Sequence, residues 1–157
     1  MKSIVFALFL GVVAACGSNE SASPDAAADP LVGTWSSALT AGVVVSMKFD
    51  GNNYTTGLIS LLTNGTYGLQ ASKGTYSIQG DTVILRKTSS SCQGVTSVTK
   101  LSSATFSRKG NGLSFSDSTT IVMFQLSTGD PTGTGVAKLG CYKADNTFQV
   151  NPLTPVP

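Results

Sequence analysis

Hydrophobic and polar side chains alternate along most of the chain after residue 40. In residues 43–49 every second side chain is large and apolar, whereas Val44, Ser46 and Lys48 lie between them. Successive side chains of a β-strand point to opposite faces, so this period of two predicts strands with one buried face. The predicted inward positions are Val43, Val45, Met47, Phe49, Tyr76, Ile78, Val83, Leu85, Phe106 and Phe124.

Turn sequences interrupt this alternation at short intervals. Segments rich in Gly, Asn and Asp occupy residues 50–53, 63–65, 79–81 and 108–112, and these residue types accept the backbone angles of tight turns. After a first strand around Trp35, they separate strands expected at residues 43–49, 54–62, 66–70, 74–78, 82–87, 98–107, 113–115, 121–126 and 136–142. We expect a Ser/Thr-rich loop at residues 88–97 and a glycine-rich loop at residues 127–135.

The order of these strands predicts an all-β domain. Strands joined in sequence by short turns form an antiparallel up-and-down meander, here of about eight to ten strands. Closure into a small barrel removes the unpaired edges of such a meander, and this is the architecture that we expect. A two-sheet sandwich is the alternative, since the same pattern is typical of it.

A different pattern opens the chain. Lys2 precedes an apolar run over residues 4–13, which leads into Val13-Ala14-Ala15-Cys16. A helix needs about twenty apolar residues to cross a bilayer, so this shorter run is typical of a signal peptide rather than of a membrane span. The arrangement resembles the signal peptide and lipobox of bacterial lipoproteins.

This resemblance implies cleavage before Cys16 and acylation, palmitate included, of that cysteine and of the new amino terminus. Residues 1–15 are then the removed signal peptide, and the lipid anchors the protein in the bacterial cell envelope. Gly17 stands where an aspartate would indicate retention in the inner membrane, so we expect the outer membrane. An ordinary signal peptide cut at an A-x-A-like site is the alternative.

Composition divides the rest of the chain into three parts. Residues 16–30 contain no large apolar side chain and carry Glu20, Asp25 and Asp29, so we expect a flexible tether. Residues 31–150 are long enough for one domain with a hydrophobic core. Residues 151–157 form a proline-rich tail that is expected to end the domain.

The three cysteines fit an extracytoplasmic location. With Cys16 acylated, Cys92 and Cys141 form an even pair in an oxidising compartment, where a disulfide is expected. Such a bond closes a loop of about 50 residues, which stabilises the fold by about 4 kcal/mol on a chain-entropy estimate. Two free buried thiols are the alternative.

Short motifs after residue 30 resemble those of bacterial lipocalin-like domains, which are small calycin-type barrels. In order, they are Leu31-Val32-Gly33-Thr34-Trp35, Phe49-Asp50-Gly51, Asn64-Gly65-Thr66-Tyr67, the segment from Gly74 to Asp81, and Val83-Ile84-Leu85. The resemblance spans roughly residues 31–126 and implies that Trp35 lies at the closed end of the barrel. The family's arginine on the last strand, which packs over that tryptophan, has no counterpart, because Arg86 and Arg108 lie earlier in the chain.

A set of large side chains is expected to line the cavity of this barrel or to fill its core. These residues are Trp35, Val45, Met47, Phe49, Tyr67, Tyr76, Phe106 and Phe124. The same residues serve either role, because an eight-stranded barrel is close to the size at which side chains fill the interior.

The composition argues against catalysis. The sequence has no histidine, which excludes Ser-His-Asp and Cys-His mechanisms and histidine metal sites. After residue 30 there is no glutamate, and the five aspartates lie mostly in turn sequences, where their side chains bond to the backbone. We therefore expect no enzyme activity, no metal site and no cofactor.

The charge distribution limits the classes of binding partner that we expect. After residue 30, nine basic and five acidic residues give a net charge of +4 without a dense basic patch, so nucleic acid is not an expected partner. We expect a non-catalytic, membrane-anchored lipoprotein whose lipocalin-like barrel binds a small apolar ligand. The alternative is a structural module of the envelope or one that binds a protein, such as an inhibitor of a secreted hydrolase.

Overall fold

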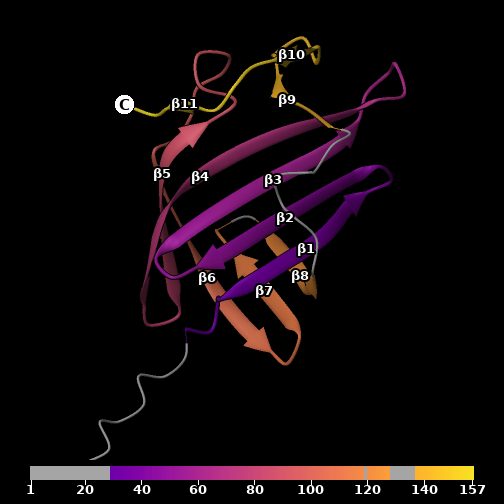
Figure 1. Ribbon diagram of the computed structural model, residues 1–157. Helices are drawn as coiled ribbons and strands as arrows, with labels where there is room; N and C mark the ends of the chain where they lie inside the picture. Colours follow the sequence, from indigo (N-terminus) through magenta and orange to yellow (C-terminus); the bar gives the residue numbers. More distant parts are fainter. Residues whose placement is uncertain (1–28, 119, 128–136) are drawn as a thin grey trace, which may run out of the picture.

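The computed structural model describes residues 29–118, 120–127 and 137–157, and its regular elements are β-strands (Figure 1). These strands are β1 (Gly33–Thr40), β2 (Val43–Asp50), β3 (Asn53–Leu61), β4 (Tyr67–Gln79), β5 (Thr82–Ser90), β6 (Leu101–Lys109), β7 (Gly112–Ser116), β8 (Ile121–Ser127), β9 (Ala137–Tyr142), β10 (Phe148–Val150) and β11 (Thr154–Pro155). Within these described parts, no helix is long and apolar enough to cross a membrane. The predicted signal peptide, almost all of the predicted tether and most of the predicted glycine-rich loop lie outside them.

Strands β1 to β8 form a closed antiparallel barrel. Each strand pairs with the next in sequence, and β8 returns to pair with β1 through Thr34–Ser127, Trp35–Leu126 and Ser36–Gln125. Closure leaves the meander without a free edge where these strands pair, which is the physical reason to expect a barrel. The predicted all-β barrel is confirmed, and the alternative of a sandwich is wrong.

Strand β4 differs from the prediction. Two short strands were expected on either side of residues 71–73, but the structure has one strand of 13 residues. Its register against β5 shifts between Lys73 and Gly74, so the interruption is a bulge within the strand and not a turn. A Cβ atom at Gly74 would collide with the carbonyl oxygen of Arg86 and with the Tyr54 ring, so glycine here permits close packing.

Three further strands extend the upper half of β4 and β5. β9 lies parallel to β4 at Tyr67–Leu69, and β10 pairs antiparallel with β9. β11 pairs with the end of β5, and Val156, which is 9% exposed, donates its N–H to Thr88 O at 3.0 Å. The expectation that the domain ends at residue 150 is therefore wrong, because the tail adds a strand and a buried side chain to it.

The expected disulfide between Cys92 and Cys141 is present, with a Cα–Cα distance of 4.9 Å. It joins the loop after β5 to β9, where Ser91 Oγ also donates a hydrogen bond to Gly140 O. Asn151 Nδ2 donates to the carbonyl oxygen of Ser91 from the segment that follows β10. The disulfide and these hydrogen bonds therefore fasten β9 and β10 to the barrel.

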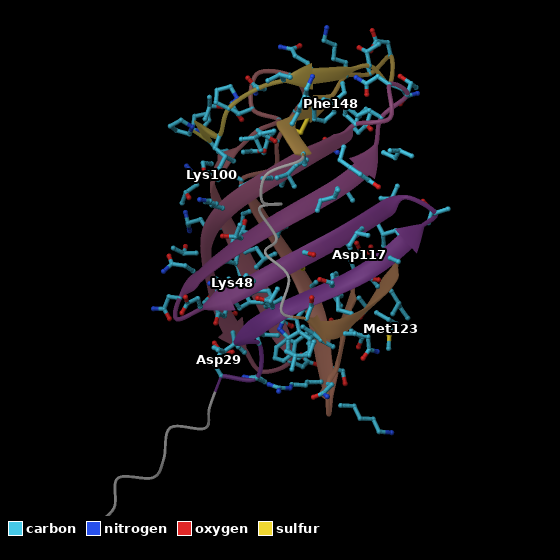
Figure 2. All side chains as sticks on the ribbon, turned by 45° about the vertical axis from the view of Figure 1, so that its right-hand side comes forward. Asp29, Lys48, Lys100, Asp117, Met123 and Phe148 are labelled. Atoms are coloured by element: carbon cyan, nitrogen blue, oxygen red, sulfur yellow. A yellow bond between two sulfur atoms is a disulfide. The ribbon has the colours of Figure 1, made fainter. Side chains whose placement is uncertain are left out.

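The barrel has two distinct ends (Figures 1 and 2). The lower end contains Asp29 and the β2–β3, β4–β5 and β6–β7 turns, and the upper end contains β9 to β11. Asp29 and Phe148, both labelled in Figure 2, lie at these opposite ends. The chain therefore enters the barrel at the end remote from its disulfide.

Candidate functional site

Apolar side chains fill the lower half of the barrel interior. Leu31, Trp35, Phe49 and Leu113 are fully buried there. The Phe49 ring contacts Tyr76 edge to face, with ring centroids 4.9 Å apart, and lies 6.1 Å from the Phe115 ring. Edge-to-face aromatic packing adds stability beyond the area that it buries. This end of the barrel is a floor and not a cavity.

A short segment ahead of β1 seals the floor. Trp35 Nε1 donates a hydrogen bond of 2.7 Å to Leu31 O, and Arg108 Nη1 donates one of 2.8 Å to Pro30 O. The fully buried Leu31 side chain joins the core cluster between them. Residues 29–32, which we name the floor segment, are therefore part of the barrel and not of a tether.

Arg108 was not predicted as part of the site. Its guanidinium carbon lies 5.2 Å from the Trp35 ring centroid, which is the geometry of a cation–π interaction. Sequence reasoning assigned Arg108 to a turn and found no arginine to pack over Trp35. The signal was present, because the alternation that places Ala104 and Phe106 inward also places Arg108 inward.

Two tyrosines of the floor have raised pKa values. Tyr76 donates a hydrogen bond of 2.5 Å to Asp29 Oδ2, and burial together with this carboxylate raises the pKa of its hydroxyl. Burial raises the pKa of Tyr54 to about 12. Both hydroxyls therefore stay protonated at neutral pH, and Tyr76 links the floor segment to β4.

The predicted inward positions differ in how completely their side chains are buried. The buried core includes Phe49, Tyr76, Val83 and Phe124, and the half-buried residues packed against it include Val45, Met47, Ile78, Leu85 and Phe106. Val43 is half-buried and lies outside this cluster. Tyr67 is 41% exposed on the opposite face of β4 from Tyr76, so the expectation that it lines the interior is wrong.

The upper wall combines apolar and polar side chains. Val45, Leu58 and Gln70 form one cross-strand row on the inward face of β2, β3 and β4. Gln70 Oε1 lies 3.0 and 3.2 Å from the two disulfide sulfurs, which carry no proton, and it accepts a hydrogen bond from the Tyr142 N–H. Below this row, Ser72 Oγ donates to Ser90 Oγ. The polar groups of this wall are thus largely bonded to one another.

Four of the surface depressions among the described residues lie where strands and loops meet. Two of them, of about 490 and 280 Å³, lie at the upper end, beside the loop 93–100 and beside the β3–β4 turn. The other two, of about 420 and 580 Å³, lie at the β2–β3 turn and beside Asp117. Among the described residues, no group of three or more His, Cys, Asp or Glu side chains could hold a metal ion.

Solved structures superpose on part of this chain. No protein-family profile and no curated protein matches the chain. A lipocalin-like protein from Bacteroides uniformis superposes with a TM-score of 0.45 at 16% identity, over 63% of this chain and all of that one. An uncharacterized protein from Bacteroides eggerthii superposes with a TM-score of 0.42 at 14% identity, over 62% of this chain and 99% of that one.

Proposed function

We propose that this protein is a lipid-anchored, non-catalytic binding protein of the bacterial cell envelope that takes a small apolar ligand into the upper half of its barrel. The observation that carries the proposal is the partial exposure of inward apolar side chains above a filled floor. Val45 and Leu58 are half-buried neighbours in one cross-strand row of the upper wall. Met47, the cross-strand partner of Trp35, is half-buried on the same inward face. Burial of such surface by an apolar ligand is favourable at about 25 cal/mol per Å².

The polarity of the wall favours an apolar ligand over a charged one. Ser72 bonds to Ser90, and Gln70 bonds to the backbone of Tyr142, so few inward polar groups of the upper wall are left to orient a ligand. Ligand sites are lined mostly by apolar side chains with a few polar groups that set orientation. An amphiphile with its apolar part inside and its polar group at the rim fits this arrangement.

The position of the floor segment supports an anchored arrangement. Asp29 lies at the lower end, so a chain anchored at Cys16 enters the barrel through its sealed floor. Twelve residues lie between Cys16 and Asp29, and the thirteen steps from one to the other span at most about 45 Å when extended. In this arrangement the upper end of the barrel faces away from the membrane.

Energy transfer from Trp35 to cis-parinaric acid tests the binding proposal, because Trp35 is the single tryptophan of the sequence. The full chain should show saturable transfer, and Met47→Gln and Leu58→Gln should each weaken it at least tenfold. These substitutions place an amide against the apolar ligand at little change in volume. The β-sheet circular dichroism should stay unchanged.

Val44→Gln is the matched control for Met47→Gln. Val44 lies on the same strand but points outward, so its substitution should leave the energy transfer unchanged. Absence of saturable transfer in the unmodified chain, or equal transfer in all three variants, would remove the binding proposal.

Metabolic labelling with a palmitate analogue tests the anchor. The unmodified chain should be labelled and should fractionate with the outer membrane, whereas Cys16→Ser should be unlabelled. Equal labelling of the two chains contradicts the anchor and leaves the ligand proposal standing.

Binding of an envelope protein is a second candidate function. Ile121 and Met123 on β8 are 71% and 60% exposed, although both are large and apolar. Exposed apolar side chains of this kind favour a protein contact when they cluster. A photocrosslinking residue at Met123 should then capture one discrete partner in cells, and the same residue at Lys109 should not.

A further inference from the structure

The upper end carries a depression that neither proposed function uses. It has a volume of about 280 Å³ and is lined by residues 62–64 of the β3–β4 turn, by Tyr142, and by residues 146–148 of the β9–β10 turn. Phe148, labelled at the top of Figure 2, marks its position. None of the side chains that line it is charged.

One wall of this depression is a fixed aromatic pair. The Tyr142 and Phe148 rings meet edge to face, with centroids 5.1 Å apart and planes at 75°. A Cβ atom at Gly68 or Gly140 would come within 2.7 Å of the Phe148 ring, so these glycines leave the space that the ring occupies. Ser60 Oγ donates to the Tyr142 hydroxyl at 3.1 Å, which leaves the tyrosine proton for another acceptor.

The rest of the lining belongs to two similar turns. Asn64 Oδ1 accepts hydrogen bonds from the N–H and hydroxyl of Thr66, and Asp145 Oδ1 accepts the same two bonds from Thr147. These contacts shape the turns and lower the pKa of Asp145. Among the described residues, the Asn146 side-chain amide and Asn64 Nδ2 make no hydrogen bond, so both are available to a ligand.

We infer that this depression binds a single neutral sugar ring. The C–H face of a pyranose is apolar and carries partial positive charge, which suits the face of an aromatic ring. Its hydroxyls both donate and accept, which suits the side-chain amides of Asn64 and Asn146 and the hydroxyl of Tyr142. A charged ligand lacks a counter-charge in this lining, and the volume suits one ring better than a long chain.

Saturation-transfer NMR on the full chain tests the sugar site, with methyl β-glucoside, methyl β-galactoside and N-acetylglucosamine as probes. Zwitterionic detergent without a sugar headgroup keeps the chain in solution. At least one probe should receive saturation. Asn146→Gly should weaken its binding at least tenfold, because the amide is lost while glycine accepts the φ of 62° at this position. Tyr142→Phe should weaken it several-fold, since the ring remains and the hydroxyl is lost.

Asn111→Gly is the matched control, because Asn111 lies in the β6–β7 turn at the lower end. It should leave binding of the sugar unchanged. Saturation of none of the three probes, or binding that survives both Asn146→Gly and Tyr142→Phe, overturns the inference. Energy transfer from Trp35 to cis-parinaric acid should be the same in all of these variants. The proposed sugar site and the proposed ligand site in the barrel are therefore tested independently.

Discussion

The two ends of the barrel are built from the same strands, yet they differ in how completely their side chains are buried. At the lower end, Trp35 and Leu31 are fully buried and the floor segment is bonded to Tyr76 and Arg108. At the upper end, inward side chains such as Val45 and Leu58 stay half-buried, and a disulfide fastens the added strands.

This difference separates stability from binding. Truncation of a side chain in the closely packed floor leaves a cavity. The residues around the cavity lose their van der Waals contacts, which destabilises the fold. Under the proposed function, the half-buried apolar side chains of the upper wall are the surface that a ligand buries. Substitutions at the lower end should therefore change the free energy of unfolding, whereas those at the upper end should change affinity first.

Trp35→Ala should give the largest effect on stability. The substitution removes a fully buried side chain, its hydrogen bond to Leu31 O and its contact with Arg108. We expect the free energy of unfolding to fall by about 4 kcal/mol, measured by denaturant titration with circular dichroism. Tyr67→Ala, at an exposed aromatic, should cost about 0.5 kcal/mol or less. Similar losses for both variants would contradict the distinction between floor and surface.

Removal of the disulfide should come next and should act at the upper end. The double variant Cys92→Ala, Cys141→Ala should lose about 3 kcal/mol of stability. Amides of β9 and β10 should lose protection from hydrogen exchange before those of β1 and β2, because the bond joins β9 to the loop after β5. Earlier loss of protection in the floor would show that the disulfide supports the whole barrel instead.

Alkaline pH should destabilise the floor through its tyrosines. Tyr54 and Tyr76 keep their protons in the folded state above the ordinary pKa of 10.0, at which the unfolded chain releases them. Their contribution is complete below pH 10 and is lost as pH rises through the folded pKa values, at about 1.4 kcal/mol per pH unit for each tyrosine. Tyr54→Phe should flatten this decline, as measured by denaturant titrations between pH 9 and about 12. An unchanged slope would contradict the assignment.

Arg108→Gln should give the smallest effect. It removes the cation–π contact with Trp35 and the hydrogen bond to Pro30 O at an exposed side chain, so we expect a loss of about 1 kcal/mol. Lys109→Gln changes the same charge one residue further along and should leave the melting temperature unchanged. Equal shifts in the two variants would indicate a general charge effect and not a specific floor contact.

Much of the architecture could be predicted because it is local. The alternation in residues 43–49 identifies the inward face of β2, and the turn sequences locate most hairpins. The bulge at Gly74 was mistaken for an interruption, because a glycine that permits close packing resembles one that permits a turn. The tail was assigned outside the domain, because its proline content conceals one short strand pairing with β5.

The site was predicted less completely than the fold. Phe49, Tyr76 and Phe124 were placed inside correctly, since side-chain alternation reports the face on which a residue lies. Alternation does not report how completely a side chain is buried, and therefore it did not separate buried Phe124 from half-buried Met47. Tyr67 was predicted to face the interior, but it is exposed. It follows a turn directly, so no preceding strand residues show which face of the sheet it lies on.

The sequence by itself determined most of the barrel strands and their antiparallel order, because period-two alternation and turn chemistry act between near neighbours. It left open whether the meander closes into a barrel or folds into two packed sheets, because closure depends on the distant pairing of β1 with β8. The tertiary structure decided which distant groups meet. Tyr76 bonds to Asp29 across 47 positions, and Arg108 bonds to Pro30 across 78. No local pattern encodes these pairs, since barrel closure and strand register bring them together. The sealed floor and the half-buried upper wall are therefore properties of the folded barrel.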